Sequence, residues 1–344
     1  MELNTIACGN CLELFKKIGD DTFDMTFADP PFNLDKKYKT YKDSIKDSEY
    51  LDWCLEWISE MFRVTSPTGT IFLHNIPKWL VRYVCMIDSE VPGNAELRHW
   101  ISWDAATTPM GKSLQPAHYG ILYYVKDPSQ CKVYELRRPH QRCRDKKCNL
   151  LIKDYGGKKE QIHPVGPLIS DVWTDIFRCK HDRYKDNHPC QLPIHLLERL
   201  ILLCTDEGDS VLDCFMGTGT TAIAAKRLGR NFYGMELSQE YVKIAQSKLT
   251  QEDMESKFNN VWISCYLERF QTVRQDDMWD AEKKDFRQEW KDIYVDWPET
   301  NEDRAAVNSK GLELKEKYQK QLKKLCSFEA TNKKGKKNGN GNGN

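Results

Sequence analysis

The chain has 344 residues, of which 40% are hydrophobic, and its 51 Lys and Arg residues balance its 51 Asp and Glu residues. This length and composition predict a globular protein with one large core or two domains, and no apolar run is long enough to span a bilayer. Because the formal charge is zero, no chain-wide field attracts a polyanion, and any contact with nucleic acid must be local.

The first 130 residues or so alternate short apolar strands with helices. The opening MELNTIACGN lacks the pattern of a secretion signal, so we expect a first strand almost at once and a cytoplasmic protein. Strand and helix alternation favours a parallel sheet with helices on its faces. The expected elements are a strand at 22–29, a helix at 49–64, a turn at SPTG (66–69) and strands at 70–76, 99–104 and 120–126. Residues 105–118, AATTPMGKSLQPAH, form a loop between the last two strands.

Residues 131–193 have little periodic pattern, and we expect an irregular insertion in the fold. Between Lys132 and Glu160 ten Lys or Arg residues face four Asp or Glu residues. This local excess predicts contact with phosphates, and a charged surface loop that only keeps the chain in solution is the alternative. Inserted segments on a rigid scaffold often carry recognition, so a DNA-recognition region is expected here.

The clearest elements follow the insertion. We expect a helix at 192–208, a buried strand at VLDCF (211–215), a helix at 220–229 closed by Gly229, and a strand at 231–237. The pattern predicts one main domain over residues 1–250. It is followed by a charged extension at 251–330 and a low-complexity tail at 331–344, which lacks the apolar surface needed to order.

The segment DCFMGTGTTA forms a glycine loop between the strand at 211–215 and the following helix. Gly217 and Gly219 allow the backbone to pass close to a ligand, and the helix N-terminus presents unpaired N–H groups. Glu236, at the end of the next strand, is placed to accept ribose hydroxyls. The loop predicts a nucleoside cofactor and fits NAD as well as S-adenosylmethionine. A turn needed only for packing is the alternative.

The segment TFADPPFN (26–33) ends a predicted strand with an acid, two prolines and an aromatic ring. Because prolines have a fixed φ and no N–H, we expect both proline carbonyls to be free acceptors on a rigid turn. The Asp29 carboxylate and the Pro30 carbonyl would accept the two hydrogens of an amino group on adenine or cytosine, which favours attack by the amine on a sulfonium methyl. Phe32 would stack on a base rotated out of its helix. A plain strand-ending turn is the alternative for this segment alone.

Together these segments resemble the DNA amino-methyltransferases, in which a D/N/S-P-P-Y/F motif is catalytic and an F-x-G-x-G motif binds the methyl donor. Here the first motif is Asp29 to Phe32 and the second is Phe215 to Gly219. Their order is similar to that of the circularly permuted beta subgroup, and the likeness covers about residues 3–250. The resemblance implies a Rossmann-like α/β fold of the S-adenosylmethionine-dependent methyltransferases and an enzyme that methylates double-stranded DNA.

The resemblance also assigns site residues. The segment HPCQLP (188–193) is similar to one that helps to enclose the methyl donor, and Asn10 stands where the family usually has Asp. The implied catalytic residues are Asp29, Pro30, Pro31 and Phe32. The implied methyl-donor contacts are Asn10, Asp29, His188, Pro189, Gln191, Asp213, Phe215, Gly217, Gly219, Thr220 and Glu236.

The cysteines raise a separate question about metal. Thirteen is an odd number, and several lie in apolar segments, so we expect reduced thiols and no disulfide framework. Cys143 and Cys148 lie at a spacing that a structural zinc ion accepts, and unliganded thiols are the alternative.

Several readings of the function stay open on the sequence. An Asp at the first catalytic position resembles adenine-N6 enzymes more than cytosine-N4 enzymes, so adenine is preferred. The rivals are a cytosine-N4 enzyme, an RNA methyltransferase, a noncatalytic nucleic-acid-binding subunit and an NAD-dependent dehydrogenase, the last of which leaves DPPF unexplained. The expected setting is DNA methylation linked to restriction, at the nucleoid in a bacterium or in the host cell of a virus. The sequence favours no oligomeric state.

Overall fold

The computed structural model describes residues 1–34, 44–93, 95–105, 117–136, 156–158, 168–176, 178 and 191–250. Cys143, Cys148, His188 and Pro189 lie outside these residues, as do most of the loop at 105–118, most of the insertion, the extension and the tail. The chain divides into two compact units, Met1–Tyr134 with Ser170–Asn259 and Glu135–Ile169 with Asn260–Asn344. The elements described below belong to the first unit.

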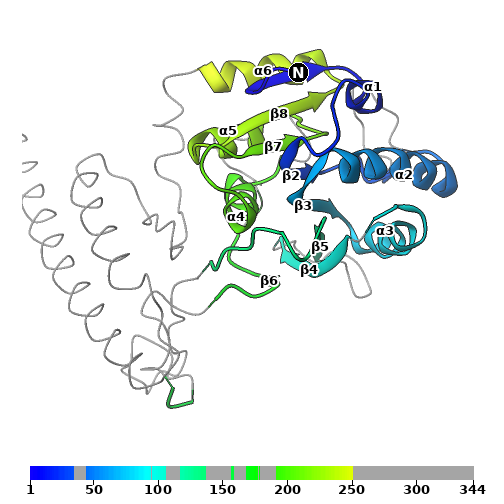
Figure 1. The fold of residues 1–344 in the computed structure, drawn as a ribbon. Helices are drawn as coiled ribbons and strands as arrows, with labels where there is room; N and C mark the ends of the chain where they lie inside the picture. The colour runs from blue at the N-terminus through cyan, green and yellow to red at the C-terminus, as the bar shows by residue number, and fades with distance from the viewer. Residues whose placement is uncertain are drawn as a thin grey trace, which may run out of the picture. The chain divides into compact units, whose positions relative to one another are not determined.

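The first unit is built on an eight-stranded sheet in the order β1-β8-β7-β2-β3-β5-β4-β6 (Figure 1). The strands are β1 (Thr5–Cys8), β2 (Phe23–Ala28), β3 (Thr65–Asn75), β4 (Glu96–Asp104), β5 (His118–Val125), β6 (Val172–Trp173), β7 (Ser210–Asp213) and β8 (Asn231–Glu236). Strands β1, β8, β7, β2 and β3 pair in parallel, as predicted, whereas β5 runs antiparallel to both β3 and β4. The sheet is therefore mixed.

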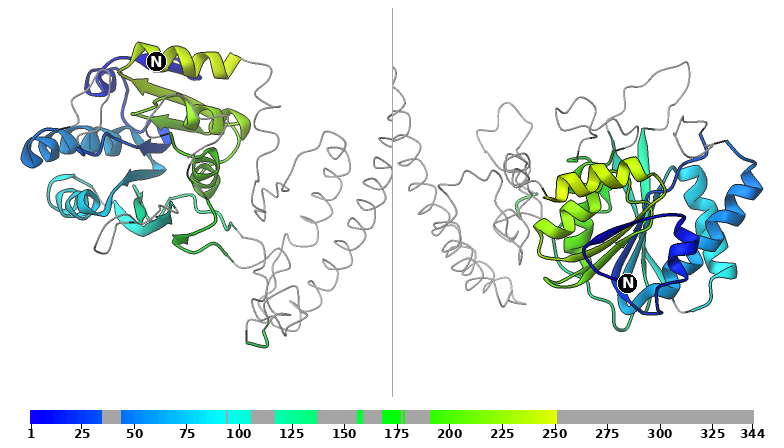
Figure 2. Two further views of the ribbon diagram at one scale, coloured as in Figure 1. Left: turned by 180° about the vertical axis from the view of Figure 1, so that it is seen from behind. Right: turned by 90° about the horizontal axis from the view of Figure 1, so that it is seen from above.

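Helices cover both faces of this sheet. They are α1 (Cys11–Phe15), α2 (Asp47–Val64), α3 (Pro77–Glu90), α4 (Ile194–Cys204), α5 (Thr220–Arg227) and α6 (Gln239–Thr250). Seen from above, α1, α2 and α3 lie on one side of the strands and α4, α5 and α6 on the other (Figure 2). Helices α2, α4 and α5 were predicted from the sequence, whereas α1, α3 and α6 were not. None of the helices among the described residues is long and apolar enough to cross a membrane.

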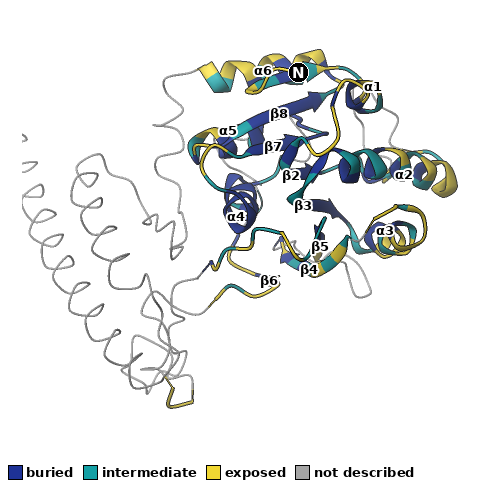
Figure 3. Cartoon of the chain, viewed as in Figure 1, coloured by how far each residue is buried: buried dark blue, intermediate teal, exposed yellow. Residues whose placement is uncertain are grey.

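Helix α2 shows how the apolar pattern sets the packing. Its residues Tyr50, Cys54, Trp57, Ile58 and Met61 recur at intervals of three or four and are fully buried against the sheet. The outward side of the helix is exposed, while the strands beneath are buried (Figure 3). This spacing produces one apolar stripe, which explains why the sequence alone was enough to place the helix.

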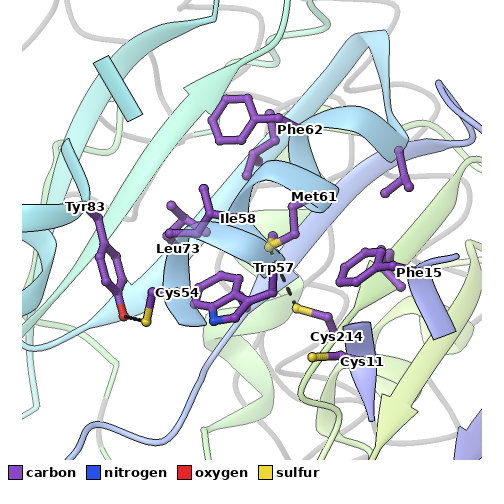
Figure 4. Close-up of a cluster of buried hydrophobic side chains, with 14 of the residues drawn as sticks. Cys11, Phe15, Cys54, Trp57, Ile58, Met61, Phe62, Leu73, Tyr83 and Cys214 are labelled. Atoms are coloured by element: carbon purple, nitrogen blue, oxygen red, sulfur yellow. Dashed lines mark hydrogen bonds between the residues drawn. The ribbon is translucent and has the colours of Figure 1, made fainter. Parts of the chain in front are cut away.

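Sulfur atoms are part of the core between α1, α2, α3 and the sheet (Figure 4). The Cys54 sulfur lies 3.2 Å from the Tyr83 hydroxyl, and the Cys214 sulfur lies 3.8 Å from the Met61 sulfur. Burial raises the pKa of the Cys54 and Cys11 thiols to about 12. All seven cysteines that the structure describes are free, as expected from the sequence, and the buried thiols of this core act as small apolar groups.

The predicted turn at SPTG is wrong, because these residues lie inside β3. Thr65 pairs with Phe23 and Thr70 pairs with Met25, so the segment between them bulges from the β2–β3 ladder. A Cβ on Gly69 would come within 2.9 Å of the Asp24 carbonyl oxygen, which explains the glycine at this point. The prediction failed because proline and glycine are typical of turns but also occur at bulges in strands, as Pro67 and Gly69 do here.

Candidate active site

Predicted site residues from four strands lie at one edge of the sheet. Strands β2 and β7 are parallel neighbours, with Phe27 opposite Asp213, and the chain leaves them in opposite directions, toward β3 and toward β8. This is a topological switch point, where open α/β sheets bind ligands beyond the carboxyl ends of their strands. Asp29 follows β2, Asp213 ends β7, Glu236 ends β8 and Asn10 follows β1.

Asp213, at the end of β7, forms hydrogen bonds that hold the glycine loop in place. One of its carboxylate oxygens accepts the Phe215 N–H at 2.9 Å and the other accepts the Thr221 hydroxyl at 2.5 Å. Burial raises the pKa of Asp213 to about 7, with a smaller contribution in the same direction from the nearby carboxylates of Asp29 and Glu236. The predicted donor-binding residue Asp213 is therefore a buried support of the loop.

Glu236 is bound to the same loop from the neighbouring strand. Its Oε2 accepts the Gly217 N–H at 2.9 Å, and its Oε1 accepts the Ser238 N–H at 2.7 Å. Burial raises the pKa of this carboxyl. Each carboxylate oxygen has a second lone pair, so Glu236 is able to accept ligand hydroxyls while it holds the loop.

Gly219 fixes how closely the loop approaches α6. Its φ is +88° at the N-cap of α5, and a Cβ there would lie 2.7 Å from the Ala245 Cβ. Gly217 also has a positive φ, of 54°. The loop geometry therefore requires glycine for its backbone angles at both positions, and for close packing at Gly219.

Replacing Gly219 with Ala is expected to lower the free energy of unfolding by more than replacing Gly229 with Ala. Both have a left-handed φ, which costs an Ala residue about 1–2 kcal/mol. Only Gly219 adds a steric clash, since a Cβ on Gly229 would make ordinary contacts of 3.5 Å or more. Urea unfolding of the two variants measures the difference. Equal losses would show that Ala245 and α6 move aside without cost.

The DPPF turn is held by two buried donors. The Tyr50 hydroxyl donates to the Pro31 carbonyl at 2.6 Å, and the Trp79 Nε1–H donates to the Phe32 carbonyl at 2.7 Å. The expectation that both proline carbonyls are free acceptors is wrong for Pro31, because the distant α2 supplies a donor. Within the described part of the chain no group donates to the Pro30 carbonyl.

Tyr50 belongs to a buried network behind the turn. Its hydroxyl lies 3.1 Å from that of Tyr83, and the Asn75 amide donates to both. Burial raises the pKa of both tyrosines, so the Tyr50 hydroxyl keeps the proton that it donates to Pro31. The network ties the DPPF turn to α2, α3 and the end of β3.

Replacing Tyr50 with Phe is expected to lower the free energy of unfolding by about 1–3 kcal/mol, because the partly buried Pro31 carbonyl and the buried Asn75 amide each lose a partner. Tyr124→Phe is the matched control, since the Tyr124 hydroxyl is buried without a partner among the described residues. The control should unfold at the same urea concentration as the wild type or above it. A Tyr50→Phe variant as stable as the control would contradict the role given to this hydroxyl.

The other predicted residues that the structure describes have different contacts. The Asn10 side chain caps α1 by accepting the Leu12 N–H at 3.0 Å. Phe32 is 6% exposed, so most of the ring expected to stack on a base is buried. The Phe215 ring packs edge-on against Trp57, with a centroid distance of 5.2 Å. Thr220 begins α5 and Gln191 precedes α4, and both are partly exposed.

His74 is a residue of this edge that the sequence analysis missed. Its Nδ1 lies 2.7 Å from the Asp29 Oδ1, and its ring is 2% exposed. It lies near the carboxyl end of β3, the strand that neighbours β2. The sequence did contain a signal for His74. It follows the apolar residues Ile71 to Leu73 directly, at the end of a predicted strand, where a polar side chain is unexpected. No group of metal-ligating side chains was found among the described residues.

Comparisons with known proteins identify the family. The sequence profile of the DNA methylase family N6_N4_Mtase matches residues 23–247. Type II methyltransferase M.BamHI of Bacillus amyloliquefaciens is 40% identical over 259 residues, which cover 74% of this chain and 59% of that protein. Type II methyltransferase M.HpaI of Haemophilus parainfluenzae is 30% identical, with coverages of 72% and 74%. The chain thus matches less than two thirds of the length of M.BamHI.

Two further comparisons concern the target base and the fold. The DNA adenine methyltransferase YhdJ of Escherichia coli (strain K12) is 30% identical, over 72% of this chain and 83% of that protein. The solved structure of the cytosine-N4-specific PvuII DNA methyltransferase superposes with a TM-score of 0.53 at 17% identity, over 72% of this chain and 86% of that one. This likeness confirms the predicted α/β methyltransferase fold. On its sequence match, its fold and its two motifs, the chain belongs to the N6_N4_Mtase family of DNA methylases.

Proposed function

We propose that the protein transfers a methyl group from S-adenosylmethionine to the exocyclic amino group of a base rotated out of double-stranded DNA, with adenine N6 as the preferred target. The observation that carries the proposal is the position of Asp29. Its carboxylate is 15% exposed and follows β2, directly beside the strand that leads into the glycine loop. An acceptor for an amine and a loop for a nucleoside thus share one switch point.

The residues of the loop fit the methyl donor. Glu236 has lone pairs left for the hydroxyls of a ribose, and the glycines at 217 and 219 leave the backbone uncovered by side chains. When bound, S-adenosylmethionine supplies an electrophilic methyl group on a sulfonium. We infer that Glu236, Gly217, Gly219 and Thr220 hold the methyl donor. The residues inferred to line the border of its site are Asn10, Phe215 and Gln191. His188 and Pro189, also predicted to contact the donor, lie outside the described residues.

The DPPF turn prepares the amine. The Asp29 carboxylate and the Pro30 carbonyl accept the two amine hydrogens, which localises the nitrogen lone pair and aligns it for attack. Once the nitrogen has gained a methyl group and a positive charge, Asp29 is the nearest carboxylate to take its proton. The donors from Tyr50 and Trp79 keep the Pro31 and Phe32 carbonyls fixed, so the turn is preorganised before a base arrives.

The choice of base and of DNA sequence is a finer proposal. The Asp at position 29 favours adenine, and the adenine enzyme YhdJ is among the relatives. The cytosine-N4 enzyme remains the second candidate, because the PvuII enzyme has the same fold. We infer that the loop at 105–118 and the insertion at 131–193 recognise DNA, with a zinc ion at Cys143 and Cys148 as one way of stiffening the insertion. Action on DNA places the protein in the cytoplasm at the nucleoid if the source is bacterial.

The proposal is tested by transfer of labelled methyl from S-adenosylmethionine to unmethylated duplex DNA, followed by nucleoside analysis. We expect N6-methyladenine with the wild type, none with Asp29→Ala, and wild-type yield with Asp52→Ala, which removes an exposed acid on α2. N4-methylcytosine as the product would change the base and keep the mechanism. Cofactor binding without any label in DNA would contradict the DNA substrate and favour RNA or a noncatalytic subunit.

A further inference from the structure

His74 and Asp29 form a close side-chain pair at the edge of the sheet. The His74 Nδ1 and the Asp29 Oδ1 are 2.7 Å apart. An ionised carboxylate only accepts hydrogen bonds, so the proton of this contact lies on Nδ1. The bond occupies one oxygen of Asp29 and leaves the second oxygen for another donor.

The other ring nitrogen of His74 has no such partner. Among the described residues nothing forms a hydrogen bond with the buried Nε2. The His74 ring is enclosed by the rings of Phe32, Trp103 and Tyr119, at centroid distances of 5.6, 5.9 and 5.4 Å. An unpaired polar atom in an apolar enclosure is unfavourable, and an apolar side chain of similar volume would avoid that cost. Stability alone therefore does not account for a histidine at this position.

We propose that His74 is a positioning residue for the methyl-transfer reaction, and this inference rests on the proposed function. The terminal torsion of an aspartate is broad, so an unrestrained Asp29 would sample many orientations. The three aromatic rings fix the His74 ring, and the ring fixes Oδ1 through Nδ1–H. Oδ2 is then held toward the target amine. The aromatic enclosure thus orients the acceptor through His74, without touching the reacting atoms itself.

Two substitutions separate this role from a structural one. In His74→Asn the side-chain amide nitrogen takes roughly the place of Nδ1, so the donor to Asp29 is kept while the outer ring atoms are lost. In His74→Leu the volume is nearly kept, whereas the donor is lost together with the unpaired nitrogen. Packing therefore predicts that the Leu variant is the more stable one. Orientation of Asp29 predicts that the Asn variant is the faster one. The two readouts, stability and rate, are expected to rank the variants in opposite orders.

The experiment measures single-turnover methyl transfer to duplex DNA, the Kd for S-adenosylmethionine and the urea midpoint of each full-length variant. We expect His74→Leu to unfold at or above the wild-type midpoint, to bind the cofactor normally and to transfer methyl about tenfold to a hundredfold more slowly. We expect His74→Asn to unfold earlier and to stay within a few-fold of the wild-type rate. Rates that follow stability, with Leu faster than Asn, would overturn the proposal.

A spectroscopic readout is independent of the substrate. In full-length protein with 15N-labelled histidine, we expect the His74 ring to show a proton on Nδ1, and Asp29→Ala to remove that preference. A proton on Nε2 alone in the wild type would overturn the inference, whatever the activity. If wild type shows the Nδ1–H form and binds the cofactor but methylates no DNA, the proposed function fails while the His74–Asp29 pair stands.

Discussion

Replacing Asp29 with Asn is expected to lower the rate of methyl transfer by about 10²–10³-fold, the usual cost of one lost electrostatic contact in a transition state. Asn has the shape of Asp, and its oxygen is able to accept from His74 Nδ1, as proposed above for the Asp29 Oδ1 at 2.7 Å. Its NH₂ group would then face the NH₂ group of the base. Two donors repel each other, and no carboxylate remains to take the proton. Single-turnover kinetics with saturating cofactor measure this loss directly.

The matched control for this variant lies on the same strand. Asp24 is at the other end of β2, where its carboxylate accepts the N–H and the hydroxyl of Ser210 at 2.9 and 3.0 Å. Asp24→Asn should lower stability and leave the single-turnover rate near that of the wild type. An Asp29→Asn rate within a few-fold of wild type would remove Asp29 from the chemistry, and an equal loss in the control would show that the strand had shifted.

Replacing Asp213 with Asn is expected to change the pH dependence of stability. Burial raises the pKa of Asp213 from 3.8 to about 7. Between these values the folded protein binds more protons than the unfolded chain, so this carboxyl makes the wild type less stable as the pH rises. One pKa unit corresponds to about 1.4 kcal/mol, which gives an upper limit of about 4 kcal/mol for the effect. Asn keeps both hydrogen bonds, since its amide is able to donate to the Thr221 hydroxyl.

The measurement is the free energy of unfolding of both proteins from pH 4 to pH 8. We expect the variant to gain on the wild type as the pH rises from about 4 to about 7 and the difference to be constant above pH 7. Groups that do not interact with Asp213 titrate alike in both proteins and cancel in the difference. A difference that does not change with pH would show that water reaches Asp213 and that the carboxyl keeps its ordinary pKa.

The elements predicted well were those with strong local patterns. The apolar stripe of α2 indicates a helix, and the run VLDCF before the glycine loop indicates a buried strand. The structure has α2 over Asp47–Val64 and β7 over Ser210–Asp213. Helix α3 was missed although Pro77 stands at its start, where proline is favourable. Its buried residues Trp79, Leu80, Tyr83 and Ile87 lie among exposed apolar ones such as Val81, which obscures the stripe.

The site was predictable where one motif contained both the residue and its task. Asp29 and the glycine loop were predicted as site residues because the chemistry expected of them depends on neighbours in the chain. The contacts of Tyr50 and His74 with the DPPF turn join residues 19 and 45 positions apart. No local pattern carries such a contact, because it exists only after the strands have paired and α2 has packed on them.

The order of the strands has a consequence for biosynthesis. Strands β7 and β8 lie between β1 and β2 in the sheet, yet they are made long after both. Until the ribosome has released Ser210 to Glu236, β1 has no partner, and one edge of β2 exposes unpaired backbone groups beside the DPPF turn. The nascent chain therefore carries its DPPF turn on an open, aggregation-prone edge, and the arrival of β7 closes that edge and brings the glycine loop beside the turn.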